Sequence, residues 1–464
     1  MKNLFGQSML GKGLLLVLLL VLLCLPLAQI GGLVGDRGVA QVQAERELAQ
    51  THAGHQQLAG PVLVVPYVER WTEAQLDANG KVSGRVPQSI SGVHLVFPEK
   101  LDVEGALAPE ERYRGIFTVL FYNWNARLTG GFAGSGPASI PRTRKDSVIE
   151  ADAPMLAVGV TDPRGIQGLP TLRLAGEEAR LQARVPGVSE RSVLASGVHA
   201  PLAGAALQAW QRGAPIPFEL KLSLLGQQRL SIVPLGEDTR ARMASPWPHP
   251  SFGGDFLPAH REVTGGGFRA EWAVTSLVTP ARSQMQANVT NPGSATESMQ
   301  TFDVALAQPV SPYSLTHRAI HYGVLFIGLV LMAAFMFELF LRLRLHAIQY
   351  GLVGMSIALF FLLLLAGSEK VAFGIAYAAA AAGSVALLAA YFAGALRSAW
   401  RGLALGAYVG LLYAALYGLL LSEDNALLLG SLLAFAMLSV LMLATRKVDW
   451  YALTARPEGA PASA

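Results

Sequence analysis

The sequence has a single cysteine, Cys24, among 464 residues. One thiol allows no intramolecular disulfide and no cysteine-based metal site, so any part that folds outside a membrane does so without covalent cross-links. Charged residues are also scarce, at 15% of the chain, and the net charge is +4. Nucleic-acid binding requires a concentrated basic surface, so this composition excludes a nucleic acid as a partner.

Signatures of the common enzyme classes are missing as well. The chain contains no G-x-S-x-G, no H-E-x-x-H, no complete P-loop motif and no dinucleotide-binding glycine pattern after a strand. His249, Asp255 and His260 are spaced six and five residues apart, which matches no established zinc pattern. We therefore expect no catalytic residues, no cofactor and no metal, and we predict that the protein is not an enzyme.

Long apolar runs, in contrast, are abundant in the C-terminal third. Each reaches the roughly 20 apolar residues that a helix needs to cross a bilayer. None shows the polar face that a water-soluble helix bundle would carry. The sequence therefore predicts five membrane-spanning helices, at Ala319–Leu341, Ala347–Gly367, Val371–Leu396, Gly402–Leu421 and Ala426–Thr445.

A sixth apolar run, Gly13–Ile30, follows a short segment that carries Lys2 and Lys12. It is either a signal peptide or a membrane anchor. Its length and the lack of a small-x-small cleavage site directly after it favour an uncleaved anchor at 13–32. The segment that follows is rich in Ala, Gln, Glu and Arg, which favour helix, so we expect the helix to continue to about residue 52.

Basic residues beside the spans predict the orientation of the chain. Lys2 and Lys12 place residues 1–12 in the cytoplasm, and the arginine pairs at 342 and 344 and at 397 and 401 fall on the same side. Both termini, including the tail 446–464, are then cytoplasmic. Residues from about 33 to 318 are exported.

The exported segment has the composition of strands and turns. Short β-branched and aromatic runs are broken by Gly, Pro, Asn and Asp from about residue 60 to 305. Phe218–Val233 alternates clearly around a GQQ string and predicts a hairpin. The predicted fold class is an α+β membrane protein with six transmembrane helices and a large β-rich, sandwich-like domain, 53–318, of one or two units between the first and second helices.

Ser245–Val263 is the most distinctive stretch outside the apolar runs. It places aromatic and histidine side chains on a proline-stiffened segment, and such a segment loses little entropy on binding. The alternative is that the rings fill the end of the sandwich core. The candidate interaction loop comprises Trp247, His249, Phe252, Asp255 and Phe256.

Glu338 lies well within an apolar run and is the candidate intramembrane polar site. A carboxylate in lipid is costly and often functional, although an i, i+4 pair with Arg342 at headgroup level is the simpler explanation. Asp162 and Arg164 similarly place a carboxylate near a guanidinium, but a tight turn is favoured over catalysis.

Small residues recur every four positions on the last three spans. Such ridges let helices approach closely, either within one chain or between copies, so the oligomeric state stays open. Polar residues at mid-membrane, which a transporter would need, are nearly absent. The ridges are Gly402–Gly406–Gly410–Ala414–Gly418, Gly374–Ala378–Ala382 and Ala426–Gly430–Ala434.

Several strings in this layout are distinctive, namely GPVLVVPY (60–67), VTDPRGI (160–166), GVHAPL (197–202), LSIVPLG (230–236), SPWPHPSFGGDFLP (245–258), QYGLVGMS (349–356), LLLLAGSE (362–369) and TRKVDWYAL (445–453). With them, the chain resembles the CreD family of inner-membrane, or cell-envelope integrity, proteins over nearly its whole length. The resemblance implies a bacterial cytoplasmic-membrane protein, so that the exported domain is periplasmic, and expression that responds to a two-component system. It also implies a link to envelope integrity and to altered tolerance of colicins and β-lactams, with no defined molecular activity.

Three functions are consistent with these features. The favoured hypothesis is a non-enzymatic inner-membrane protein that supports envelope integrity and stress tolerance through contacts of its periplasmic domain with an envelope protein or a cell-wall partner. One alternative is a transporter or membrane-embedded enzyme acting on lipid or cell-wall intermediates. The other is a membrane sensor or modulator of a two-component system.

Overall fold

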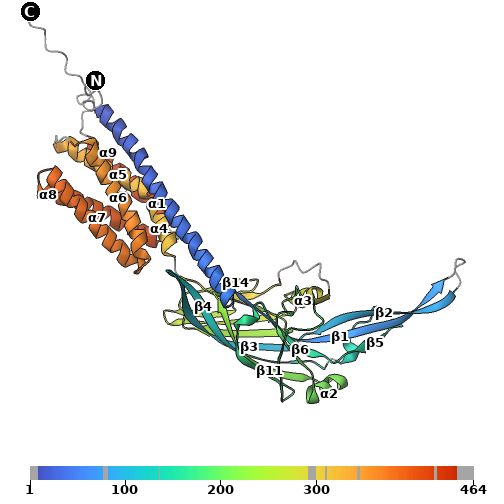
Figure 1. Ribbon diagram of the computed structural model, residues 1–464. Helices are drawn as coiled ribbons and strands as arrows, with labels where there is room; N and C mark the ends of the chain where they lie inside the picture. The colour runs from blue at the N-terminus through green and yellow to red at the C-terminus, as the bar shows by residue number, and fades with distance from the viewer. Residues whose placement is uncertain are drawn as a thin grey trace, which may run out of the picture. The chain divides into compact units, whose positions relative to one another are not determined.

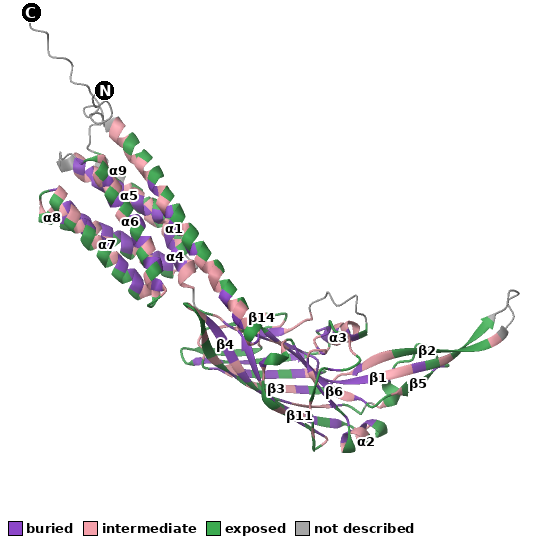
Figure 2. Ribbon diagram, viewed as in Figure 1, coloured by how far each residue is buried: buried purple, intermediate pink, exposed green. Residues whose placement is uncertain are grey.

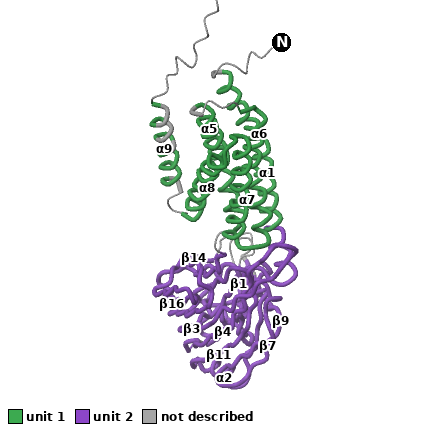
Figure 3. The backbone as a smooth tube through the Cα atoms, turned by 90° about the vertical axis from the view of Figure 1, so that its left-hand side faces the viewer, with its two compact units in different colours: residues 1–41, 310–464 green, residues 42–309 purple. Residues whose placement is uncertain are grey.

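The computed structural model describes residues 9–76, 82–134, 136–290, 299–308, 311–341, 345–422 and 426–446. The chain divides into two compact units, coloured separately in Figure 3. Residues 1–41 and 310–464 make the helical unit, and residues 42–309 make the β unit. Helix α1 contributes to both, since it is continuous from Met9 to Thr51.

Among its described residues, the helical unit contains six further helices (Figure 1). Their sequences are dominated by Leu, Ala, Phe and Val, and their inward-facing residues share one apolar core with α1. The helices are α4 (Pro312–His321), α5 (Gly323–Leu341), α6 (Ala347–Ser368), α7 (Phe373–Ala395), α8 (Ala399–Leu421) and α9 (Ala426–Thr445).

Within the described residues, four helices are long and apolar enough to cross a membrane, namely α1, α6, α7 and α8. A bent pair, α4 and α5, makes a fifth candidate, with an angle of 46° at the break. The span expected at 319–341 therefore includes a bend near its start, where α4 ends at His321 and α5 begins at Gly323. Helix α4 carries His317, Arg318 and His321, and the uniformly apolar helix starts only at Gly323.

About half of the predicted glycine ridge on α8 packs closely against α7. A Cβ added at Gly402 would lie 2.5 Å from the backbone nitrogen of Ala393, and one at Gly406 would lie 2.7 Å from the Cβ of Ala389. Helices α7 and α8 therefore approach closely at this end. At Gly418, in contrast, an added Cβ would meet nothing within 4 Å.

The β unit consists of two sheets. The nine-stranded sheet has the order β14-β17-β12-β1-β6-β10-β9, with β2 and β5 also paired to β1, and the eight-stranded sheet has the order β15-β16-β13-β3-β4-β11-β7-β8. The strands are β1 (Gln56–Leu76), β2 (Val82–Val96), β3 (Lys100–Arg114), β4 (Phe117–Phe132), β5 (Val148–Ala151), β6 (Met155–Val160), β7 (Ile166–Leu174), β8 (Glu177–Ala179), β9 (Gln182–Ala183), β10 (Val198–Pro201), β11 (Ile216–Gln227), β12 (Arg229–Val233), β13 (Asp238–Ser245), β14 (Pro250–Gly254), β15 (His260–Thr264), β16 (Gly267–Thr275) and β17 (Phe302–Leu306).

One core joins the two sheets. Strand residues alternate between buried and exposed, as β16 shows with Phe268, Ala270, Trp272 and Val274 buried. The largest apolar cluster contains buried side chains from both sheets, and two smaller clusters hold other buried strand residues; Figure 2 colours the buried positions along the strands. The β unit is thus one sandwich-like body, to which α2 (Gly204–Arg212), α3 (Ala281–Thr290) and the 3-10 turns η1 (Pro137–Ser139) and η2 (Pro163–Gly165) are added.

The hairpin expected at Phe218–Val233 is wrong. Strand β11 pairs with β4 and β7 in the eight-stranded sheet, whereas β12 pairs with β1 and β17 in the nine-stranded sheet. The chain crosses between sheets at Gln228, whose φ is 56°. Alternation reports which face of a strand is buried but not which strand is its neighbour, so a crossover and a hairpin look alike in sequence.

Strands β1 and β2 continue past the rest of their sheet as a two-stranded arm (Figure 1). Strand β5 joins β1 only from Tyr67 to Arg70. At this base, the buried Glu69 accepts hydrogen bonds from the hydroxyls of Thr143 and Ser147 and from the backbone N–H of Thr143 and Arg144. The segment 143–147 thereby holds the base of the arm.

Candidate functional sites in the two units

Glu338, on α5, is buried where three helices meet. Its carboxylate forms an ion pair with the ammonium of Lys12 on α1, and it accepts a 2.6 Å hydrogen bond from the hydroxyl of Tyr350 on α6. The Glu338 side chain is 6% exposed. Arg342, the partner expected from the sequence, lies outside the described residues. Lys12 is 326 positions away and Tyr350 lies 12 positions away on the next helix, so the spacing within one helix could not reveal either partner.

A second ion pair links α1 to α6. Arg37 Nε lies 3.4 Å from the carboxylate of Glu369, which also accepts a hydrogen bond from the hydroxyl of Tyr313. Lys12 and Arg37 lie about 38 Å apart along α1, at about 1.5 Å per residue. The hydrocarbon core of a bilayer is about 30 Å thick, so the two pairs bracket the apolar stretch of the helix.

Other polar groups inside the helical unit also bond to neighbouring helices. The Tyr377 hydroxyl donates to the backbone oxygen of Tyr413 at 2.7 Å, and the hydroxyls of Ser384 and Tyr413 lie 3.0 Å apart. All three side chains are buried. These hydrogen bonds join α7 to α8. The groups that make them are therefore engaged between helices and are less available to bind a solute.

The stretch expected as an interaction loop is partly an edge strand. Residues 250–254 form β14, which pairs with β17. The Phe252 ring packs edge-on against Phe268 and Trp272, with centroids 5.6 and 5.8 Å away. The Trp247 indole N–H donates to the backbone oxygen of Ala307 at 2.8 Å. These two rings pack against the core, which matches the alternative interpretation of this stretch.

The other three candidate residues of this stretch differ in their surroundings. The carboxylate of Asp255 accepts a hydrogen bond from the backbone N–H of Thr301 at 3.0 Å. Phe256 packs against the core, and its backbone oxygen accepts from the Trp272 indole. His249 is exposed, with its ring edge-on to Trp247. His249 and Asp255 are therefore the members of the set whose residues are exposed.

Asp162 and Arg164 act together at the end of α1. The Arg164 guanidinium donates to both oxygens of Asp162, at 2.9 and 2.6 Å, and also to the backbone oxygens of Gln50 and Ala49. These hydrogen bonds hold the pKa of the Asp162 carboxyl below its usual value. A guanidinium at a helix C-terminus satisfies carbonyls that lack partners and complements the helix dipole.

The segment 162–165 is indeed a turn, as the sequence predicted, but its function as a helix cap was not foreseen. Gln56 completes the junction, because its buried side-chain amide donates to the backbone oxygens of Asp162 and Leu225 at 2.9 and 3.0 Å. Gly165 has no room for a Cβ, which would lie 2.3 Å from the Leu225 oxygen. The end of α1, the start of β1 and β11 are therefore locked together.

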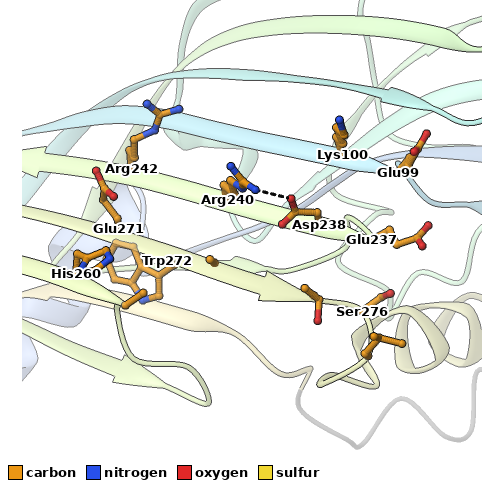
Figure 4. Close-up of a pocket in the computed structure, with 14 residues that line it drawn as sticks. Glu99, Lys100, Glu237, Asp238, Arg240, Arg242, His260, Glu271, Trp272 and Ser276 are labelled. Atoms are coloured by element: carbon orange, nitrogen blue, oxygen red, sulfur yellow. Dashed lines mark ion pairs between the residues drawn. The ribbon is translucent and has the colours of Figure 1, made fainter.

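A charged cavity of about 940 Å³ lies on the outer face of the eight-stranded sheet (Figure 4). Ala273 is small and stands opposite Arg240, which leaves the hollow between longer side chains. Arg240 pairs with Asp238 at 3.1 Å, and Arg242 pairs with Glu104 at 3.0 Å. The charged or titratable residues that line it are Glu99, Lys100, Glu237, Asp238, Arg240, Arg242, His260 and Glu271.

Strand alternation marks these residues as solvent-facing but gives no signal of a cavity. The hollow depends on the register that sets Ala273 beside two arginines from another strand. No group of three or more His, Cys, Asp or Glu positioned to hold a metal ion occurs among the residues that the structure describes.

Comparison with known proteins bears on both units. A family model described as "Inner membrane protein CreD" matches residues 8–451. The chain is also 32% identical over 434 residues to the inner membrane protein CreD of Escherichia coli strain K12, covering 94% of this chain and 92% of that protein. The chain belongs to the CreD family. With its apolar helices, this membership makes it a multi-pass protein of the bacterial inner membrane.

Solved structures add nothing to this assignment. The chain matches an M1 zinc metallopeptidase from Deinococcus radiodurans with a TM-score of 0.23 and 9% identity, over 45% of this chain and 42% of that one. A mutant of that enzyme bound to a Tyr-Ser-Ala substrate gives a TM-score of 0.21 and 10% identity over the same shares. Likeness at these scores supports no argument about fold or function.

Proposed function

We propose that this CreD-family protein is a non-enzymatic inner-membrane protein that supports cell-envelope integrity and tolerance of envelope stress and antimicrobials. Its β unit lies in the periplasm and contacts an envelope protein or a cell-wall component. Its helices cross the membrane six times, with both termini in the cytoplasm, and anchor the β unit. The charged cavity beside Arg240 and Arg242 is the contact site.

One observation supports this proposal above the others. Several polar side chains inside the helical unit make hydrogen bonds across helices: Glu338 with Lys12 and Tyr350, Tyr377 with the backbone oxygen of Tyr413, and Ser384 with the Tyr413 hydroxyl. A transporter or membrane-embedded enzyme needs polar groups that face a path or a cavity. The hollow beside Tyr377 and Tyr413 in the helical unit is lined by small, apolar and tyrosine residues and has no charged side chain, whereas the β unit presents charged side chains around a solvent-facing hollow. The helical unit is therefore suited to anchoring and the β unit to binding.

The orientation is tested by cysteine labelling in a Cys24→Ser background. Leu169→Cys, at a position that is 95% exposed in the β unit, should react with a membrane-impermeant maleimide in cells whose outer membrane alone is permeabilised. Arg397→Cys, in the turn between α7 and α8, should react only after the inner membrane is opened. Equal labelling of both positions in intact spheroplasts contradicts the proposed topology.

The contact site is tested by complementation of a deletion strain under envelope stress. The double variant Arg240→Glu, Arg242→Glu reverses two charges at the cavity, and we expect it to fail to restore tolerance. A matched control, Arg173→Glu with Lys221→Glu, reverses two similarly exposed charges elsewhere on the same face and should restore it. The cavity is not the contact site if both variants complement at equal membrane abundance.

A further inference from the structure

The outer edge of β2 carries a side chain in place of a neighbouring strand. The backbone N–H of Leu95 donates to the Gln286 side-chain oxygen at 2.9 Å, and the Gln286 amide N–H donates to the Val93 oxygen at 3.0 Å. Gln286 is on α3. One side-chain amide thus makes both hydrogen bonds that the N–H and C=O of one residue in an added parallel strand would make.

This contact fixes which backbone groups of β2 point outward. Consecutive residues of an antiparallel strand direct their N–H and C=O to opposite sides, and the β1–β2 register has no irregularity before Gln75. Ser91, Ser89 and Pro87 therefore point away from β1, as Val93 does. Ser89 and Ser91 are exposed, and no strand pairs with this edge within the described ranges.

We propose that two copies of the chain pair antiparallel through this edge, about a twofold axis at Ile90. Ser89 of each copy then lies opposite Ser91 of the other, and the two pairs exchange four hydrogen bonds. Pro87, which has no N–H, lies opposite Val93. The Val93 oxygen already accepts from Gln286, so the missing donor leaves no acceptor unpaired.

Neighbouring registers would leave hydrogen-bonding groups of this edge without partners. If the twofold axis lay at Ser91, Ser89 of one copy would stand opposite Val93 of the other. The Ser89 N–H would then meet the Val93 oxygen, which already accepts from Gln286. If the twofold axis lay at Ser89, Ser91 of one copy would stand opposite Pro87 of the other. The Ser91 oxygen would then receive no hydrogen bond, because proline has no N–H. Each unpaired group costs free energy once it is buried in an interface. The register centred on Ile90 avoids both losses.

The side chains along this edge fit a second copy of the strand. Ile90 is 50% exposed and would face its own symmetry mate as a non-hydrogen-bonded pair, in which side chains lie closest. The pairing ends at Pro87 and Val93, because the Gln286 amide occupies the edge between Val93 and Leu95. Arg85 is the one charged residue in β2, whereas free edges are commonly guarded by several charges. An interface that uses the same patch twice is self-complementary and closes as a dimer.

The test is disulfide cross-linking of the full-length protein in native membranes, in a Cys24→Ser background. Ile90→Cys would place two Cα atoms about 4.5 Å apart, within the range of about 4.4–6.8 Å that a disulfide spans. We expect its covalent dimer to exceed that of Glu73→Cys, on β1 of the same arm, by about tenfold. Ser89→Cys and Ser91→Cys should cross-link strongly when co-expressed and weakly when expressed alone.

A second variant separates strand pairing from random collision. Ser89→Pro removes an N–H that points away from β1, so the β1–β2 ladder stays intact while the pairing loses two hydrogen bonds. In the Ile90→Cys protein it should lower the dimer yield about tenfold, whereas Ser89→Ala should not. The proposal fails if Ile90→Cys dimerises no better than Glu73→Cys, if it cross-links to other proteins instead, or if Ser89→Pro has no effect.

Discussion

Each of the two units buries a carboxylate, and they stabilise it in different ways. Glu338, in the helical unit, is held by the ammonium of Lys12 and the hydroxyl of Tyr350, from two other helices. Glu69, in the β unit, is held by hydroxyls and backbone N–H groups of one segment, 143–147. One anion has a counter-charge, and the other has hydrogen bonds from neutral donors.

The difference follows from where backbone donors are available. Every N–H inside a membrane helix is used by that helix, so an acid between helices depends on side chains from its neighbours. A connection beside a sheet leaves N–H groups free, and several of them can point at one oxygen. Buried charge therefore ties distant segments together in the helical unit, whereas in the β unit it orders a single loop.

The largest effect should come from breaking the buried ion pair. Lys12→Met or Glu338→Met alone leaves one charge without its partner, and we expect each to destabilise the protein by about 3 kcal/mol. The double variant removes both charges and should recover most of that loss. Thermal unfolding in detergent, analysed as a double-mutant cycle, measures the coupling; additive losses would show that the pair does not stabilise the unit.

The next largest loss of stability should come from disturbing the close packing of α7 against α8. Gly402→Ala places a methyl group 2.5 Å from the Ala393 nitrogen, so we expect a loss of about 2 kcal/mol from overpacking. Gly418→Ala, on the same helix with nothing within 4 Å, serves as the control and should be neutral. Equal melting temperatures for the two variants would mean that the helices are not in close contact at Gly402.

Replacement of Glu69 should change the pH dependence of stability. Hydrogen bonds from the hydroxyls of Ser147 and Thr143 hold the pKa of Glu69 at about 2, against about 4.3 for an unfolded chain. The unfolded state binds the proton first, so stability falls as the pH falls from about 4.3 to about 2. Glu69→Gln should lower stability at neutral pH and flatten this acid slope. An unchanged slope would show that Glu69 is not the titrating group.

The smallest effect is expected at the cap of α1. Arg164→Ala removes a cation from the helix C-terminus and should lower the stability of the last turn slightly. Hydrogen exchange at residues 47–51 should increase, because the last carbonyls lose their donors. Arg173→Ala, a similarly exposed arginine distant from the helix, should leave these amides protected. Equal exchange in both variants would contradict the capping role.

Features that depend on the local sequence pattern could be predicted. Composition alone placed the end of the first helix at about residue 52, and the helix ends at Thr51. Alternation from Phe218 onward identified the buried face of β11, where Phe218, Leu220, Leu222 and Leu224 are buried. The CreD resemblance, carried by strings along most of the chain, is confirmed by the family match over residues 8–451.

Features that depend on contacts between remote segments could not be predicted. The partner of Glu338 is 326 positions away, and Arg164 caps a helix that ends more than a hundred residues earlier. The crossover at Gln228 has the same alternation as a hairpin. In each case the sequence identified a residue of unusual type or position, but long-range packing decided what it contacts.

The ion pair between Lys12 and Glu338 also has a consequence for synthesis. The first helix leaves the ribosome long before residue 338 has been translated, so Lys12 spends that interval without its carboxylate. During that time the apolar run of α1 must hold its place in the bilayer alone, with the lysine stem extended toward the headgroups. Completion of the pair therefore marks a late step of assembly, when the first and the later helices first come together.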